Sequence, residues 1–300
     1  MRKIVLCLAV CLMILTFAGC GNQGTEPSDK QNTTELNKEG VVSRDLFVWS
    51  DEDDTKIVGY TSEGLEAKTI IIPAECTSVQ GLLDNTVVEY IEFLNPDTVI
   101  EPNAFMNNTA LIEVKLPGNL DIINGYVFSD CSSLQNIVIP EGVKSIGSNA
   151  FRGCAALEQV TLNTQLETIG RKAFHGCSAL KSLEMPDTVV EIAKSAFENC
   201  ASLTSVSLSN GLKTVCESTF QGCNSLKTVR SPDGVTTLEE SAFAHCELLE
   251  EIYLPASLES VALSSIVQNH TIKVYIFEGS YIDGRLEELM GAEFYDRCYQ

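Results

Sequence analysis

The chain has 300 residues, of which 44% are hydrophobic and 20% are charged. This balance supplies enough apolar material for a large core and too little charge for a disordered protein. Acidic residues outnumber basic residues by 41 to 20, which gives a formal net charge of −21 at pH 7. So large an acidic excess argues against nucleic-acid binding and against electrostatic docking on anionic lipid, since both need a cationic surface.

Residues 1–19 have the organisation of a secretory signal peptide. An apolar run from Ile4 to Ala18 is short for a bilayer span, which needs roughly 20 apolar residues. The run ends in Phe17-Ala18-Gly19-Cys20, which resembles the lipobox of bacterial lipoproteins, although Phe17 stands where that motif usually has Leu. The resemblance implies that Cys20 becomes the lipidated N-terminus. The alternatives are an ordinary signal peptide cut nearby and an uncleaved anchor.

Residues 20–44 form a polar stretch that follows the predicted anchor. Almost nothing in this stretch can pack, so a disordered tether is the simplest interpretation. Such a tether lifts a folded part off the membrane. We therefore expect a bacterial protein that reaches the cell membrane only through its lipid and faces the extracellular side.

The rest of the chain is organised by a repeat of 23 residues. Phe recurs at this interval, Cys recurs at the same interval, and Leu follows each of these Cys by three residues. The columns are Phe105, Phe128, Phe151, Phe174, Phe197, Phe220 and Phe243; Cys131, Cys154, Cys177, Cys200, Cys223 and Cys246; and Leu134, Leu157, Leu180, Leu203, Leu226 and Leu249. Three columns with one fixed period indicate a solenoid.

A single repeat predicts how each coil folds. The segment that opens at Leu157 is apolar at its positions 1, 4 and 6, and its second half alternates as a strand buried on one side does. The middle apolar pair, Val143 and Ile146 in the preceding copy, begins the return path. We expect an α/β repeat solenoid with a parallel β-sheet on the concave face. Short helical turns, some of them 3₁₀, should form the convex side.

The repeat pattern resembles the BspA-like leucine-rich repeats of bacterial surface proteins. One copy carries it in full: Leu134, Ile137, Ile139, Pro140, Val143, Ile146, Gly147, Ala150, Phe151 and Cys154. Other copies depart from it, with Asn108 in place of Cys, Val127 and Thr219 in place of Ala, and Cys216 and Glu239 in place of Gly. The resemblance covers about two-thirds of the chain. It implies a leucine-rich-repeat solenoid with a role in adhesion.

Atypical segments flank the repeats, as expected where a solenoid end exposes core and strand edge. Residues 45–80 predict a β-hairpin cap around an acidic turn, followed by a degenerate first coil. Residues 81–266 form the predicted solenoid. Residues 267–300 predict a C-terminal cap, with a strand at 272–277 and a short helix at 278–289.

The cysteines are the first candidates for chemistry. Their 23-residue spacing lacks a metal-ligand pattern such as Cys-x-x-Cys. Stacked coils bring neighbouring Cys roughly 5 Å apart at the backbone, which leaves disulfides open. Parallel side chains in the core favour buried free thiols, with disulfides and a metal as the weaker alternatives. Cys76 also falls on a core column, whereas Cys216 and Cys298 have no assigned partner.

Other polar groups give no catalytic pattern. The acidic run 51–54 offers oxygen ligands for Ca²⁺ but lacks the spacing of an EF-hand loop, so a solvated turn is favoured. The three His form no triad, and the chain has no nucleophile elbow, phosphate-binding loop or paired His. We therefore expect no enzyme activity, no cofactor and no metal.

The outward positions of the predicted strands are the better place for function. These positions are mixed and mostly polar. The candidate binding residues are Tyr90, Glu92, Ile112, Glu113, Lys115, Glu158, Lys181, Glu184, Lys227, Arg230, Glu251 and Tyr253. Tyr90, Ile112 and Tyr253 are the expected exposed anchors, because interface hot spots favour aromatic side chains. The alternative is a solvated face without a specific ligand.

These observations favour a monomeric surface module that binds an unknown protein or host-matrix ligand. A lipoprotein that binds envelope glycan is the second hypothesis, although it would call for more aromatic platforms than this face offers. A structural or accessory subunit of the envelope is the third. An enzyme ranks last.

Overall fold

The structure is a computed structural model, and it describes residues 44–262, 264–266, 272–285 and 295–299. All of these residues belong to the compact unit formed by residues 39–300. The predicted signal peptide, Cys20 and nearly all of the predicted tether lie outside the described residues. Within the described part, no helix is long and apolar enough to cross a membrane.

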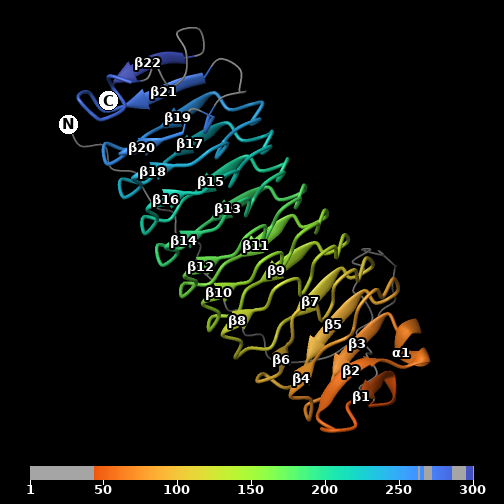
Figure 1. The fold of residues 1–300 in the computed structure, drawn as a ribbon. Helices are drawn as coiled ribbons and strands as arrows, with labels where there is room; N and C mark the ends of the chain where they lie inside the picture. The colour runs from red at the N-terminus through yellow and green to blue at the C-terminus, as the bar shows by residue number, and fades with distance from the viewer. Residues whose placement is uncertain (1–43, 263, 267–271, 286–294, 300) are drawn as a thin grey trace, which may run out of the picture. The chain divides into compact units, whose positions relative to one another are not determined.

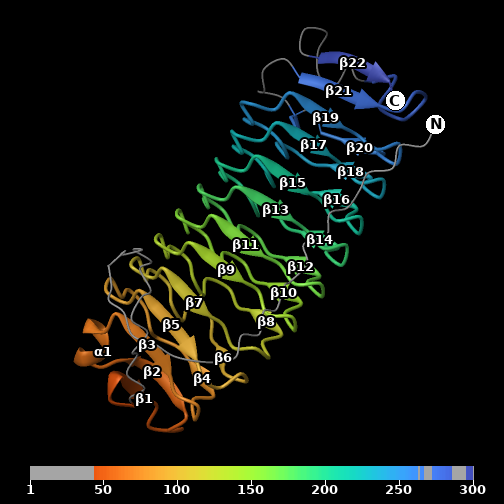
Figure 2. The same ribbon diagram turned by 180° about the vertical axis from the view of Figure 1, so that it is seen from behind.

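This unit is a stack of coils, most of which have one longer strand and one strand of two residues (Figure 1, Figure 2). The longer strands are β3 (Thr69–Ile72), β5 (Tyr90–Phe93), β7 (Glu113–Lys115), β9 (Asn136–Val138), β11 (Gln159–Thr161), β13 (Ser182–Glu184), β15 (Ser205–Ser207), β17 (Thr228–Arg230), β19 (Glu251–Tyr253) and β21 (Ile272–Ile276). The shorter strands are β4 (Ser78–Val79), β6 (Val99–Ile100), β8 (Ile122–Ile123), β10 (Ser145–Ile146), β12 (Thr168–Ile169), β14 (Glu191–Ile192), β16 (Thr214–Val215), β18 (Thr237–Leu238) and β20 (Ser260–Val261).

Neighbouring coils pair in parallel and in the predicted register. Val160 of β11 lies opposite Ile137 of β9, which is a shift of one 23-residue repeat. The parallel-strand solenoid is thus confirmed; that its longer strands form a concave face stays a prediction. The shorter strands were not predicted, because their residues were assigned to the return path. They form parallel ladders of their own, as between β10 and β12.

The segment around each column Phe is a run of turns, so the predicted helical turns are not confirmed. Its N–H groups alternate between two kinds of acceptor. Ala150 N–H donates to Gly147 O in its own coil, whereas Phe151 N–H donates to Ala173 O of the next coil at 2.8 Å. Positive φ values at Asn149 (58°) and Gly153 (73°) permit this alternation. In a helix the N–H groups would bond to carbonyls of the same helix, so no main-chain hydrogen bonds would join neighbouring coils on this side.

The core is built from columns in which each side chain contacts its counterparts one coil before and after. The seven Phe from Phe105 to Phe243 are fully buried. Adjacent rings are stacked with centroid separations of 5.2–5.6 Å and interplanar angles of 3–12°. This spacing is slightly wider than the separation of paired strands, as expected for offset stacking.

The N-terminal hairpin consists of β1 (Phe47–Trp49) and β2 (Lys56–Tyr60), which pair antiparallel around the acidic turn. Strand β2 also pairs in parallel with β4 and so continues the ladder of shorter strands. A 3₁₀ turn, η1 (Arg44–Leu46), precedes the hairpin, and one short helix follows it, α1 (Ser62–Glu66). Thr61 caps this helix by accepting a hydrogen bond from Gly64 N–H.

The C-terminal end differs in part from the prediction. The expected strand is present as β21, paired with β19. A further strand that was not predicted, β22 (Tyr295–Tyr299), pairs in parallel with β21. Residues 281–285 form turns where a helix was predicted, and residues 286–289 of that predicted helix lie outside the described residues.

The Phe column gives the first testable prediction. Phe174→Ala should lower the free energy of unfolding by about 3–5 kcal/mol, because it leaves a cavity between two stacked rings. Urea denaturation followed by circular dichroism measures the loss. Thr161→Ala, at an exposed position of β11, is the control and should change stability by less than about 0.5 kcal/mol. Equal effects of the two substitutions would contradict the role of the Phe column.

Candidate binding face

The outward residues of the longer strands form one surface, which we call the long-strand face. Its residues alternate with the core, as in β11, where Gln159 and Thr161 are exposed and Val160 is buried. Most of the predicted binding residues lie on this face as expected. Lys115, Glu158, Lys181, Glu184, Lys227 and Arg230 are exposed; Glu92, Ile112, Glu113, Glu251 and Tyr253 are half-buried.

The prediction that Tyr90 is an exposed anchor is wrong. Its relative exposure is 3%. The Lys115 ammonium lies 5.7 Å from the ring centroid, and the hydroxyl donates to Glu92 Oε2 at 2.7 Å. Burial raises the pKa of Tyr90, while hydrogen bonding to Tyr90 and Glu92 raises the pKa of Lys115. The phenol is therefore part of a fixed polar cluster. The prediction used only the outward position of Tyr90 in its strand, which does not show that neighbouring side chains cover the ring.

Several cations of this face are paired with a carboxylate of a neighbouring coil, which is the following coil for Lys68 and the preceding coil for Lys115 and Lys181. The Nζ–carboxylate distances are 2.7 Å for Lys68 and Glu89, 3.2 Å for Lys115 and Glu92, and 2.5 Å for Lys181 and Glu158. Exposed pairs of this kind contribute about 0–1 kcal/mol each. Their main effect is to hold long side chains in one position across neighbouring coils.

A fixed aromatic stack lies at the C-terminal end of the long-strand face. The rings of Tyr253 and Tyr275 are parallel, with centroids 4.2 Å apart, and the Arg230 guanidinium lies 3.6 Å from the Tyr253 centroid. Both tyrosine hydroxyls donate to Glu251, each at 3.2 Å. Partial burial and the Glu251 carboxylate raise the pKa of Tyr275 to about 12, so it remains a donor at neutral pH.

Tyr275 was missed as a site residue because its strand was assigned to the cap. The register of β19 and β21 places it directly opposite Tyr253, at a shift of 22 residues instead of 23. The alternation of inward and outward residues in the segment 272–277 could have identified Tyr275 as an outward residue. The strand is atypical in sequence but continues the same surface.

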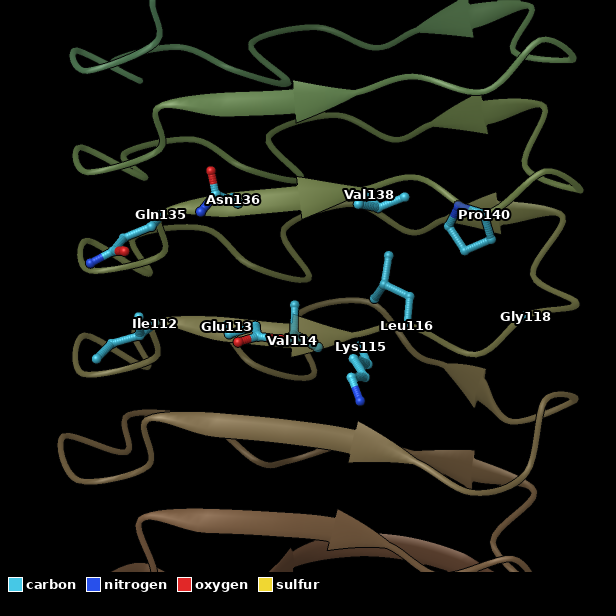
Figure 3. Close-up of a pocket in the computed structure, with 10 residues that line it drawn as sticks. All are labelled: Ile112, Glu113, Val114, Lys115, Leu116, Gly118, Gln135, Asn136, Val138 and Pro140. Carbon is cyan, nitrogen blue, oxygen red and sulfur yellow. The ribbon is translucent and has the colours of Figure 1, made fainter. Parts of the chain in front are cut away.

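Two hollows open on the long-strand face where neighbouring strands are not joined in one ladder. Strands β7 and β9 belong to different sheets, and so do β15 and β17. The first hollow, of about 500 Å³, lies between β7 and β9 and is lined by Ile112, Leu116 and Val138 among others. Figure 3 shows Leu116 extending from the end of β7 toward β9, with Val138 across from it. We call this the β7–β9 hollow.

The β7–β9 hollow is lined by both apolar and polar side chains, and its lining is mainly apolar. Val138 is 65% exposed, the most exposed large hydrophobic side chain among the described residues. Glu113, Lys115, Gln135 and Asn136 line the same hollow. The second opening, between β15 and β17, has a volume of about 480 Å³ and a mostly polar lining that includes Arg230. We call it the β15–β17 slot.

The Cys column has a structural explanation that needs no metal or disulfide. Each column thiol donates to the main-chain carbonyl of the Phe in the preceding coil. For Cys154 the Sγ–O distance to Phe128 is 3.1 Å, and for Cys177 it is 3.2 Å to Phe151. The prediction of buried free thiols is confirmed for this column and for Cys76, and Cys216 is free and half-buried. The side chain of Cys298 is not described.

Asn108 takes the place of Cys in the Cys column and, like the column thiols, donates a hydrogen bond to a main-chain carbonyl of the preceding coil. Its Nδ2 donates to Leu82 O at 2.8 Å, where Leu82 occupies the place of the column Phe one coil earlier. Its Oδ1 accepts the N–H of Asn85 at 2.7 Å. The departure from the repeat therefore keeps a donor at a buried carbonyl, which would be costly to leave unpaired.

Within the acidic turn, the Asp53 carboxylate finds its partners among neighbouring residues of the same hairpin. Asp53 Oδ1 accepts hydrogen bonds from the N–H and the hydroxyl of Thr55, and Lys56 lies 3.2 Å from Asp53. These hydrogen bonds lower the pKa of Asp53. The favoured interpretation, a solvated hairpin turn, thus accounts for this carboxylate. Among the described residues, no group of three or more His, Cys, Asp or Glu is arranged to hold a metal ion.

The repeated coils, parallel ladders and exposed strand face define a leucine-rich-repeat solenoid. A comparison with protein-family models matches residues 54–158 and 144–273 to the BspA type leucine rich repeat region, in 6 copies. The chain belongs to the BspA-type leucine-rich repeat family. No curated protein matches the chain at a significant level.

The chain is similar to solved structures from several bacteria. A T. pallidum leucine-rich repeat protein is 24% identical with a TM-score of 0.51, covering 70% of this chain and 91% of that one. A protein from Eubacterium ventriosum is 18% identical with a TM-score of 0.49, covering 66% and 64%. One from Bacteroides ovatus is 20% identical with a TM-score of 0.44, covering 87% and 100%. At 24% identity, the similarity to the T. pallidum protein supports the fold alone.

The Cys column predicts a loss of stability at alkaline pH. Burial raises the pKa of Cys131, Cys200 and Cys246 to about 12. An unfolded thiol ionises near pH 8.5. The contribution of these thiols to the free energy of unfolding is therefore fully present below about pH 8.5. It falls as pH rises toward 12, by up to about 1.4 kcal/mol per pH unit for each thiol.

Urea unfolding of the full chain between pH 8 and 10.5, under reducing conditions, measures this slope. The Cys131→Ala variant should be less stable at pH 8 but should show a shallower decline with pH. Mass spectrometry after denaturing alkylation is the second measurement and should find the column thiols alkylated. An unchanged slope, or column cysteines that resist alkylation as disulfides, would contradict the assignment.

Proposed function

We propose that this chain is a lipid-anchored binding scaffold of the bacterial cell surface that engages a partner protein with its long-strand face. The observation that carries the proposal is the β7–β9 hollow, an apolar depression on an otherwise polar face. Solenoids commonly bind partners along such extended strand surfaces. Burial of an apolar side chain in a rigid, polar-rimmed hollow is the usual centre of a protein interface.

The long-strand face supports protein binding better than binding of a glycan. Both tyrosines of the C-terminal stack have a covered face, since Tyr253 lies between Arg230 and Tyr275. Tyr90 is buried. The predicted anchors therefore leave little open aromatic surface for a sugar ring. The same face offers exposed Val138 and half-buried Ile112 as apolar contacts.

The proposed anchor depends on Cys20 and on the lipobox-like sequence that precedes it. A lipid at Cys20, followed by a polar tether, would place the solenoid outside the membrane with its long-strand face free. We propose that the chain works there as a monomer, with a protein or host-matrix ligand and without nucleic acid. The net charge of −21 supports the last point.

Val138→Glu tests the binding face. A charge placed in the β7–β9 hollow should weaken binding to a partner recovered from a surface lysate by at least about tenfold, because the carboxylate resists burial. Val190→Glu is the matched control, since Val190 is 56% exposed and lies beside the shorter strand β14. Surface plasmon resonance with both full-length variants measures the change. Equal weakening by the two substitutions would contradict the proposed face.

Cys20→Ser tests the anchor. The variant should lose incorporation of a labelled fatty acid and should accumulate as an unprocessed or released form, because Ser provides no thioether attachment. Metabolic labelling followed by gel electrophoresis and membrane fractionation measures both effects. Cys7→Ser, within the predicted signal peptide, is the control and should leave labelling intact. Label that persists in the Cys20→Ser protein would refute Cys20 as the modified residue.

A further inference from the structure

We propose that the β15–β17 slot binds a carboxylate of an acidic segment of the partner protein, with Arg230 as the receptor. This inference rests on the proposed function, because it assumes a protein partner on the long-strand face. It adds a second contact point, four coils away from the β7–β9 hollow, and it names the chemistry of the group that binds there.

Arg230 is held in place before any ligand arrives. Its guanidinium lies over the Tyr253 ring, with Cζ 3.6 Å from the ring centroid, and the parallel ring of Tyr275 holds Tyr253 with the two centroids 4.2 Å apart. Glu251 accepts from both hydroxyls and so fixes the two rings. A guanidinium stacked in this way keeps the N–H groups at its edge directed away from the ring face. That edge matches the two oxygens of a carboxylate.

The guanidinium has no acidic partner in the described part of the chain. The ion pairs on this face use Lys68, Lys115 and Lys181, and none of them includes Arg230. Glu251 is engaged by the tyrosine hydroxyls. An exposed, preorganised arginine without a carboxylate partner is a binding group for an external anion.

The slot supplies further hydrogen-bond donors beside Arg230. Ser205, Ser207, Thr228 and Ser231 line it together with the guanidinium. The hydroxyl oxygen of Ser231 is buried and has no hydrogen-bond partner among the described residues. A buried hydroxyl without a partner costs free energy that a ligand or an ordered water can recover.

One carboxylate, Asp187, also lines the slot. The N–H and the side-chain amide of Asn210 donate to its Oδ1 at 3.2 and 3.0 Å, so it is bound to its own neighbour. Its charge opposes an incoming anion. Asp187 therefore provides an internal test, because removing its charge should strengthen binding of a carboxylate.

An acidic protein segment fits the slot better than an acidic sugar. Tyr253 has one face under Arg230 and the other against Tyr275. Among the described residues, no open ring face therefore adjoins Arg230 for a sugar to stack on. The slot also runs between two strands, and an extended peptide can follow it while one acidic side chain reaches Arg230.

The experiment uses the full-length protein in detergent and four probes in fluorescence anisotropy. The first two probes are fluorescein-labelled peptides, Ser-Asp repeated four times and Ser-Asn repeated four times. The third is a labelled tetragalacturonate, and the fourth is free acetate, which is added as a competitor of the Ser-Asp peptide. The variants are Arg230→Gln, Arg230→Lys, Asp187→Asn and the control Arg171→Gln, an exposed arginine on the turn side of its coil.

The proposal expects the Ser-Asp peptide to bind and the Ser-Asn peptide to bind at least tenfold more weakly. Arg230→Gln should weaken Ser-Asp binding about tenfold, and Arg230→Lys should weaken it less because charge remains without the planar edge. Asp187→Asn should strengthen it about two- to threefold, and Arg171→Gln should leave it unchanged. Acetate should compete at high concentration.

Three results of the anisotropy experiment would overturn the proposal. Equal binding of the two peptides would show that no carboxylate is recognised. Unchanged binding by the Arg230→Gln protein would place the receptor elsewhere. Tighter binding of tetragalacturonate than of the Ser-Asp peptide would assign the slot to a glycan. If Val138→Glu weakens binding of the lysate partner but Arg230→Gln does not, the proposed function stands and this inference fails. If neither variant affects that partner, the function proposal itself fails.

Discussion

Stacking of the coils at the Phe column is the interaction on which the other parts of the structure depend. Each column Phe between Phe105 and Phe243 contacts the ring before and after it, and its carbonyl accepts the thiol of the next coil, as Phe128 accepts from Cys154 at 3.1 Å. Around the same Phe, N–H groups bond to the next coil, as Phe151 does to Ala173. The column thiols and these N–H groups therefore form two rows of hydrogen bonds that join the coils on the turn side. If this side were helical, only side-chain contacts would join the coils there.

Close joining on the turn side limits what the opposite side can do. Added side-chain volume is excluded where backbones approach, since a Cβ on Gly147 would lie 2.7 Å from Gly125 N. The longer strands pair in several short sheets instead of one continuous ladder, as the shorter strands also do. The β7–β9 hollow and the β15–β17 slot lie at two of these interruptions. Both candidate sites thus lie where two neighbouring longer strands do not share a ladder.

Repeat periodicity predicts the core well because each core residue has the same neighbours in every coil. The Phe, Cys and Leu columns could be placed from spacing alone, and all of them are buried. Asn108 was identifiable as a departure, but its role needed the positions of Leu82 O and Asn85 N–H. The shorter strands could not be predicted, because two residues such as Ser145 and Ile146 carry too little alternation to indicate a strand.

The outward residues follow different rules, since nothing in the repeat specifies their neighbours. Strand alternation correctly directs Val138 and Arg230 outward. It says nothing of Lys115, which lies over Tyr90, or of Tyr275, which holds Tyr253 across a boundary between the repeats and the predicted cap. Such contacts join side chains from different coils, and their residue types change from coil to coil. A repeat protein can therefore vary its binding groups without disturbing its fold, because the inward columns carry the stability and the outward positions carry the specificity.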